Sequence, residues 1–167
     1  MSVNFAHAYR VLPITRHDLD RVLGIEQAAY AFPWSRGNFI DSLAAGHPSR
    51  LLCDPQGTVL GYFVAMQGVD EMHLLNLTVA PAAHGRGHGR SLLAIVVDLC
   101  RSRAAQQLWL EVRQSNHRAQ SIYAQFGFRV SGVRKGYYPA AQGRREDAVV
   151  MNLTIAPLPT HLYDALG

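Results

Sequence analysis

The segment that most constrains this chain is the glycine-rich GRGHGR, residues 85–90, which lies between an apolar stretch and a long helical pattern. The apolar stretch, EMHLLNLTVAP over residues 71–81, predicts a strand, and the next pattern predicts a helix from about Gly87 to Ala104. A helix N-terminus attracts anions, because it presents unpaired backbone N–H groups and the positive end of the helix dipole. The segment predicts either an anion-binding strand–loop–helix or a plain loop whose glycines serve only turn geometry.

Phosphate is the anion that this loop favours. Gly85, Gly87 and Gly89 carry no Cβ, so the backbone there can come close to a phosphate group. Arg86 and Arg90 add positive charge where a diphosphate would need it. The spacing GxGxG differs from the GxGxxG of dinucleotide-binding folds, and no Gly-Lys-Ser/Thr of a P-loop is present. The segment is therefore neither of these two phosphate-binding motifs, and a plain loop stays the alternative.

Neither the histidines nor the cysteines indicate a metal site or a disulfide. His84 and His88 stand four residues apart, but that spacing converges two ligands only on a helix, and glycines interrupt it here. Cys53 and Cys100 are far apart in the chain and form no CxxC pair, which predicts two reduced, buried thiols. We therefore expect no metal.

Composition narrows the classes of function. Hydrophobic residues make up 49% of the chain and charged residues 17%, a balance typical of a folded, soluble protein. No apolar run approaches the roughly 18 residues of a membrane span, and the N-terminus lacks a signal-peptide stretch, so we expect a cytoplasmic protein without membrane contact. The net charge of +4 suits an anionic ligand but is too small to indicate direct nucleic-acid binding.

The remaining patterns alternate between strands and helices. Hairpins early in the chain and strand–helix–strand units later predict an α/β fold, with a mixed sheet and helices on both faces. At 167 residues the chain fits a single domain, 1–167, and its tail, 155–167, carries no clear pattern. The further expected elements are a strand over 7–14, a helix capped by Thr15 and Asp18 that runs to about Tyr30, a short helix capped by Ser35 that ends at Gly46, strands over 49–54 and 58–67 joined by the turn DPQG, a strand over 107–112, a helix from Asn116 to Phe126 closed by Gly127, and strands over 128–135 and 146–153.

A carboxylate and a phenol follow the glycine loop. Alternation along LWLEVR puts Glu111 and Arg113 on one face of a strand, opposite its leucines. If helices cover this apolar strand, burying the Glu111 carboxylate costs free energy unless it is paired or takes part in the chemistry. The alternative is that Glu111 pairs with Arg113 on an exposed face of the strand. Tyr123, on the next expected helix, is either an acid or a core aromatic. Together, the loop, the carboxylate and the phenol suggest a transferase that uses a phosphate-bearing cofactor.

Several stretches resemble one known family. NLTVAPAAHGRGHGRSLL resembles the acetyl-CoA-binding motif of the GNAT acetyltransferases, (Gln/Arg)-x-x-Gly-x-(Gly/Ala), with His84 in place of the Gln or Arg. Within that superfamily, AFPWS, LWLEVRQSNHRAQSIYAQFGF, RKGYYP and REDAVVMNL resemble the bacterial ribosomal-protein-alanine N-acetyltransferases of the RimI type. The resemblance covers most of the chain and is strongest from Leu74 to Leu153. Because several motifs occur in order, it is highly specific.

The resemblance implies a fold and a set of site residues. The GNAT sheet is splayed between its fourth and fifth strands, here near residues 77–79 and 108–112, where it admits the pantetheine arm of acetyl-CoA. Glu111 falls on the general base of the family and Tyr123 on its general acid. The implied cofactor contacts are the backbone of Leu77, Thr78 and Val79, the pyrophosphate loop of Gly85, Arg86, Gly87, His88, Gly89 and Arg90, and Asn116, while Trp34, Tyr137 and Tyr138 border the peptide site.

The implied reaction is transfer of the acetyl group of acetyl-CoA to an N-terminal α-amine, an alanine, of a ribosomal protein of the small subunit. An α-amine has a pKa of about 7.7–8.0 against about 10.4 for lysine, so a neutral lysine costs about 3.4 kcal/mol more near neutrality. A carboxylate is therefore a sufficient base for an N-terminus. Since neither cysteine lies in the constellation, we expect direct transfer in a ternary complex, by a monomer. The alternative is a GNAT enzyme that acts on a small-molecule amine or a lysine side chain.

Overall fold

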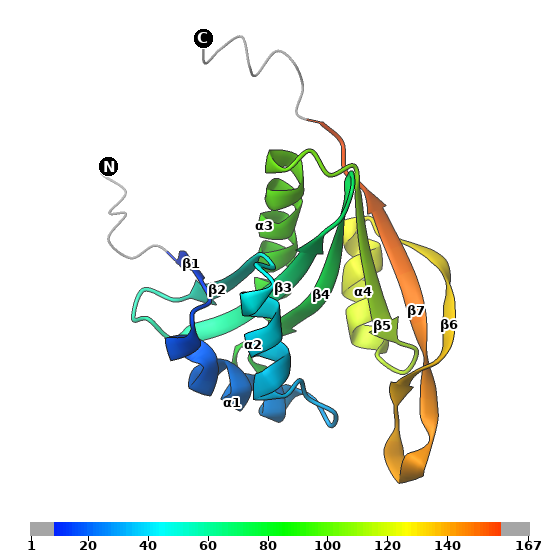
Figure 1. Cartoon of the computed structure of the whole chain (residues 1–167), viewed down its shortest axis with the longest axis horizontal. Coiled ribbons are helices and arrows are strands. Elements are labelled where there is room, and N and C mark those ends of the chain that lie inside the picture. Colours follow the sequence, from blue (N-terminus) through cyan, green and yellow to red (C-terminus); the bar gives the residue numbers. More distant parts are fainter. Residues whose placement is uncertain (1–8, 158–167) are drawn as a thin grey trace.

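The computed structural model describes residues 9–157, in which one mixed sheet has helices on both of its faces (Figure 1). Its seven strands lie in the order β1-β2-β3-β4-β5-β7-β6. The strands are β1 Arg10–Pro13, β2 Ser49–Cys53, β3 Val59–Gln67, β4 Glu71–Val79, β5 Gln107–Arg113, β6 Arg129–Pro139 and β7 Arg145–Thr154, and the helices are α1 Leu19–Ala29, α2 Arg36–Ala44, α3 His88–Ser102 and α4 His117–Phe126.

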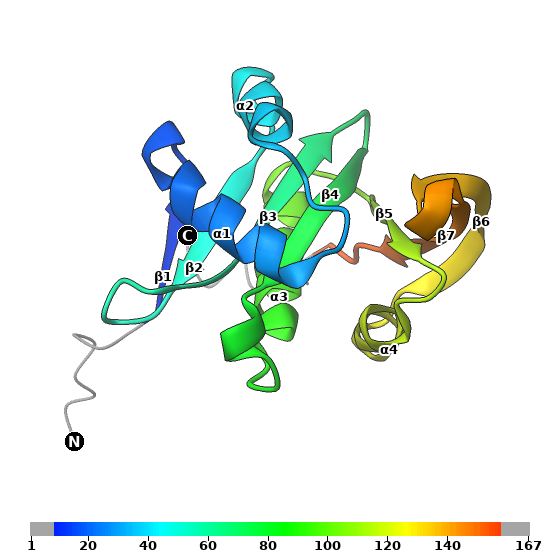
Figure 2. The ribbon, with the colours of Figure 1, turned by 90° about the horizontal axis from the view of Figure 1, so that it is seen from below.

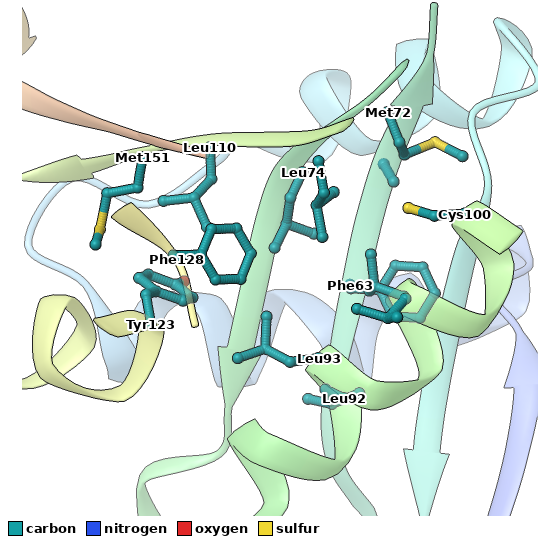
Figure 3. Packing of buried hydrophobic residues seen from close by; sticks show 14 of the residues in the cluster. Phe63, Met72, Leu74, Leu92, Leu93, Cys100, Leu110, Tyr123, Phe128 and Met151 are labelled. Carbon is teal, nitrogen blue, oxygen red and sulfur yellow. The ribbon is translucent and has the colours of Figure 1, made fainter. Parts of the chain in front are cut away.

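Alternation along the central strands sends side chains into two cores. Tyr62 and Val64 of β3 join the cluster under α1 and α2, whereas Phe63 and Ala65 join the cluster under α3 and α4. Figure 2 shows the two pairs of helices on opposite faces of the sheet. In the second cluster, Figure 3 shows side chains of β3, β4, β5 and β7 facing side chains of α3 and α4. The predicted α/β fold is confirmed.

The helix starts follow from local capping, as the sequence predicted. Asp18 accepts a hydrogen bond from Thr15 N at 2.8 Å, and a short 3₁₀ turn leads into α1. The Ser35 hydroxyl accepts from Asn38 N at 3.1 Å at the start of α2. Asn116 accepts from Ala119 N at 3.1 Å at the start of α4. Ser35 and Asn116 satisfy backbone donors that the first helical turn leaves unpaired, whereas Asp18 binds back to the N–H of Thr15, ahead of the helix.

The sheet opens between β4 and β5, which positions the candidate site. The two strands run parallel and pair only from Glu71 to Leu74 and from Gln107 to Leu110. Beyond those four positions the strands diverge, and Figure 1 shows the gap widening toward the N-terminal end of α3. β5 continues its pairing with β7 on its other side up to Arg113. The predicted splay between the fourth and fifth strands is confirmed.

Some expected boundaries were wrong or lie outside the described residues. β6 continues to Pro139, four residues past its expected end, through an irregular stretch in which Gly136 has a φ of +58°. Asp147 of β7 accepts from Gly136 N at 2.8 Å, and this long-range bond holds the stretch. The first two residues of the strand expected over 7–14, and residues 158–167 of the tail, lie outside the described part of the chain.

The prediction of two reduced, buried thiols is confirmed. Cys53 and Cys100 are free and buried, on opposite faces of the sheet. Burial raises the pKa of Cys100 to about 11, so this thiol is protonated and unreactive near neutrality. Within residues 9–157, no helix is long and apolar enough to cross a membrane.

Candidate active site

A cavity of about 390 Å³ lies at the open end of the splay. Its walls come from α1, β4, the glycine loop, the first turn of α3, and α4. Two residues expected in the cofactor site, Thr78 and Arg86, do not line it. The expected site residues that do line it are Leu77, Val79, Gly85, Gly87, His88, Gly89, Arg90, Asn116 and Tyr123.

The glycine loop has the geometry that an anion site needs. Gly85 and Gly87 have φ values of +76° and +79°, a left-handed backbone that favours glycine. A Cβ built on either residue would meet no atom within 4 Å, so the space in front of this backbone is open. Gly87 is the N-cap of α3, a helix of 15 residues, whose first N–H groups therefore lie at the wall of the cavity. The loop fits the phosphates of a cofactor.

Alternation along β4 decides which backbone groups face the gap. Ala80 N donates to Leu60 O of β3 at 2.8 Å, so Thr78, two residues earlier, also turns its backbone toward β3. Leu77 and Val79 then turn their N–H and C=O groups toward the splay. The expected contact by Leu77 and Val79 is compatible with this geometry, whereas the backbone of Thr78 is turned toward the sheet.

Two side chains that the sequence did not assign reach those exposed carbonyls. Tyr30 Oη lies 3.3 Å from Leu77 O. His84 Nε2 lies 3.0 Å from Val79 O, and His84 Nδ1 lies 3.1 Å from Arg118 Nη1. Because arginine only donates, Nδ1 accepts and Nε2 carries the proton toward Val79 O. This contact gives His84 a place in the cavity wall at the position where the motif has Gln or Arg.

The two loop histidines face different partners. The His84 ring lies between Val79 O and Arg118. The His88 ring is buried and lies against Tyr9 at a centroid distance of 5.8 Å. Their imidazoles therefore do not converge on one point.

Glu111 lies one residue beyond the last β4–β5 pair and does not line the cavity, and its carboxylate is paired. Its side chain is 7% exposed, with Oε1 at 3.2 Å from Arg134 Nε and Oε2 hydrogen-bonded to His73 Nε2. The alternative of a Glu111–Arg113 pair was wrong, because Arg113 instead binds Glu146 at 3.0 Å across the sheet. Arg113 of β5 binds Glu146 on the adjacent strand β7, whereas Arg134 reaches Glu111 from β6, on the far side of β7. The sequence analysis did not identify His73. The only local indication is that a polar residue stands on the same face of β4 as Leu77.

Tyr123 is both a core residue and part of the cavity wall. Its ring packs on Phe128 at 5.6 Å in the cluster shown in Figure 3, and the residue also lines the cavity. Burial, and then the neighbouring Tyr30 and Tyr138, raise the pKa of Tyr123. Burial, then Tyr137, and then the charge of Glu111 raise the pKa of Tyr138. The Tyr123 phenol is therefore protonated throughout the neutral range and can donate.

The expected peptide-site residues separate into two groups. Tyr137 and Tyr138 pack edge to face at 4.9 Å on β6, and Arg113 lies over Tyr138 at 4.5 Å. The Arg113 guanidinium also lies over Phe32 at 5.2 Å, so one arginine links the α1–α2 loop to the β6–β7 hairpin. The Trp34 ring lies instead against Phe39 of α2 at 5.1 Å. Phe32, which the sequence analysis did not single out, is thus the loop aromatic that contacts Arg113.

Known proteins resemble this chain in sequence and in structure. The acetyltransferase (GNAT) family matches residues 19–128. The [ribosomal protein bS18]-alanine N-acetyltransferase of Haemophilus ducreyi is 38% identical over 84% of this chain and 96% of that protein, and its namesake from Escherichia coli K12 is 37% identical over 83% and 93%. The crystal structure of the ribosomal-protein-S18-alanine N-acetyltransferase from Escherichia coli superposes with a TM-score of 0.81 at 34% identity, over 93% of this chain and 99% of that one.

Proposed function

Because the chain belongs to the acetyltransferase (GNAT) family, we propose that it transfers the acetyl group of acetyl-CoA to the N-terminal α-amine of a ribosomal protein. The acceptor residue is alanine, and the transfer is direct, in a ternary complex. The observation that carries this proposal is the single cavity that runs from the N-terminus of α3 to Tyr123. The relatives whose names specify that substrate match this chain over more than four fifths of its length.

The cavity fits acetyl-CoA at both ends. The open backbone of Gly85 and Gly87 and the first turn of α3 would hold its pyrophosphate, with Arg90 adding charge. The backbone groups of Leu77 and Val79, turned toward the gap, would hold its pantetheine arm. When bound, acetyl-CoA supplies an acetyl group activated as a thioester. The protein's own part is to place an amine beside it and to move protons.

Glu111 is the proposed proton acceptor for the attacking amine. It lies beyond the last paired position of β4 and β5, on the same side of the strand as Arg113 and the aromatic residues of the hairpin. His73, bonded to its Oε2, is the next group to which a proton can pass. Tyr123, protonated because burial raises its pKa, donates toward the sulfur that leaves.

The acceptor preference follows from the chemistry of the amine. Deprotonating a lysine amine near pH 7 costs about 3.4 kcal/mol more than deprotonating an α-amine. A single paired carboxylate is a sufficient base for the α-amine, which is the easier of the two to deprotonate. The names of the relatives support the same choice, and the comparisons do not favour a small-molecule amine or a lysine side chain. A ribosomal-protein substrate places the proposed activity in the cytoplasm.

Mass spectrometry tests the proposal directly. The protein is incubated with acetyl-CoA and a peptide that begins with a free alanine, and in parallel with the same peptide whose N-terminus is blocked and whose only amine is a lysine. We expect one acetyl group on the alanine N-terminus and none on the blocked peptide. Acetylation of the lysine without N-terminal product would contradict the substrate and leave the family assignment in place.

A further inference from the structure

One buried carboxylate, Glu26, lies outside the cavity, in the last turn of α1. Glu26 is only 1% exposed, and a carboxylate at such a depth is costly unless its lone pairs are satisfied. It accepts from three sources: the Tyr62 hydroxyl, the Trp34 backbone N–H at 3.1 Å, and the Asn76 amide at 3.2 Å from each oxygen. These donors come from β3, from the α1–α2 loop and from β4. One side chain thus ties three segments together.

From Glu26 the hydrogen bonds continue toward the cavity, and all of their donors point back toward Glu26. Asn76 Oδ1 accepts from Thr78 Oγ1 at 2.7 Å, and this bond uses the only hydroxyl proton of Thr78. The Tyr30 hydroxyl, 2.8 Å from Thr78 Oγ1, must therefore donate to it. The resulting chain of donors runs from Tyr30 through Thr78 and Asn76 to Glu26. Bonds arranged head to tail in a buried site polarise one another, which favours a single orientation of each group.

The two ends of this network lie at the two substrate sides of the proposed enzyme. At one end of the network Tyr30 lines the cavity. Its hydroxyl lies 3.3 Å from Leu77 O, a backbone group that is turned toward the splay. At the other end the Trp34 N–H fixes the α1–α2 loop, two residues after Phe32, which touches the hairpin through Arg113. The Glu26 carboxylate is thus hydrogen-bonded directly to the α1–α2 loop and, through Asn76 and Thr78, to Tyr30 at the cavity.

We propose that Glu26 is a positioning residue that holds the Tyr30 hydroxyl at the cofactor cavity and the α1–α2 loop at the acceptor side through one hydrogen-bonded network. This inference rests on the proposed acetyl transfer, because that reaction identifies one side as the cofactor site and the other as the acceptor site. The hydrogen-bonded network itself does not depend on the reaction. Glu26 touches neither substrate. It acts through Tyr30 at the cavity and through the Trp34 backbone at the loop.

Two conservative variants separate positioning from plain stability. Thr78→Val keeps the shape of the side chain and cuts the network between Asn76 and Tyr30. Tyr62→Phe removes a donor to the same carboxylate but leaves the path to Tyr30 intact. Both variants should lower the melting temperature, because each leaves a buried polar group without a partner. Only Thr78→Val should raise the KM for acetyl-CoA, by about three- to tenfold, the scale of one hydrogen bond.

Glu26→Gln tests both ends at once. It keeps the size of the side chain, and we expect KM to rise for acetyl-CoA and for the alanine peptide. Equal KM values for acetyl-CoA in Thr78→Val and Tyr62→Phe would overturn the proposal and leave Glu26 a purely structural residue. If the wild-type protein does not acetylate the peptide, the proposed function fails separately. Calorimetry with CoA then decides the positioning question, since Thr78→Val should weaken CoA binding and Tyr62→Phe should not.

Discussion

His73 on β4 and Glu111 on β5 are hydrogen-bonded to each other where the two strands part. His73 is opposite Trp109, inside the paired region, and Glu111 follows the last paired residue, Leu110. Arg134 of β6 binds the other carboxylate oxygen at 3.2 Å. The Glu111 carboxylate is therefore held from both sides of the gap.

Replacing Glu111 by Gln should lower turnover sharply near neutral pH. The amide keeps the shape of the side chain but cannot take a proton from the amine. The defect should shrink above about pH 8, where α-amines are increasingly neutral in solution. A pH series of kcat/KM on the alanine peptide measures this effect.

Arg134→Gln is the matched control for that series, because it removes the other partner of Glu111 from a half-exposed position. We expect a small change in rate with no change in the shape of the pH profile. A Glu111→Gln variant whose deficit stays constant from neutral to alkaline pH would show that Glu111 is not the base.

Tyr123→Phe should lower kcat by roughly 10²-fold or more, the usual scale for a positioned acid or base. Stability should change little, because the ring keeps its packing on Phe128. Turnover under conditions in which the chemical step limits the rate, together with a thermal melt, checks both expectations. Unchanged turnover would leave Tyr123 with its packing role alone.

A side chain on the glycine loop should abolish acetyl-CoA binding. Gly87→Val would do so, but it also forces a β-branched residue into a left-handed backbone, with a φ of +79°. Gly89→Val is the cleaner variant, because Gly89 has no positive φ and its Cβ would meet only Val79 Cγ2, at 3.7 Å. Isothermal titration calorimetry on the folded variant measures the loss. Gly132→Val, in open space on β6, is the matched control and should bind normally.

Alkaline pH should unfold the protein as its buried tyrosines ionise. Burial raises the pKa of Tyr30 to about 12, and burial followed by the charge of Glu26 raises the pKa of Tyr62. A raised pKa means that the folded state favours the protonated form. This contribution to stability is complete below about pH 10, the ordinary pKa of tyrosine, and is lost as the pH rises toward 12.

Absorbance of tyrosinate and circular dichroism, recorded on the same samples, test that prediction. We expect the buried Tyr30 and Tyr62 to ionise together with the loss of structure. Complete ionisation of all tyrosines near pH 10 with the fold intact would contradict the burial of Tyr30 and Tyr62.

The sequence predicted the elements well where local interactions decide them. The caps at Thr15, Ser35 and Asn116 lie within three residues of the groups they bind, so their patterns are visible in a short window. The end of β6 was missed because Gly136 is held by Asp147, eleven residues away on another strand. The splay came from the family resemblance and not from periodicity, which reports only the face of a strand.

Local sequence patterns were sufficient to predict the fold class, the glycine loop at the start of α3, and which strand residues face the same way. These follow from the periods of two and 3.6 residues and from the freedom of glycine, all properties of nearby residues. The partners of the charged side chains became clear from the three-dimensional arrangement: Glu111 with His73 and not Arg113, Arg113 with Glu146, and Glu26 with Asn76, fifty residues away. A charged side chain can pair with any opposite or polar group that the register brings within reach, and register is set by the packing of the whole sheet.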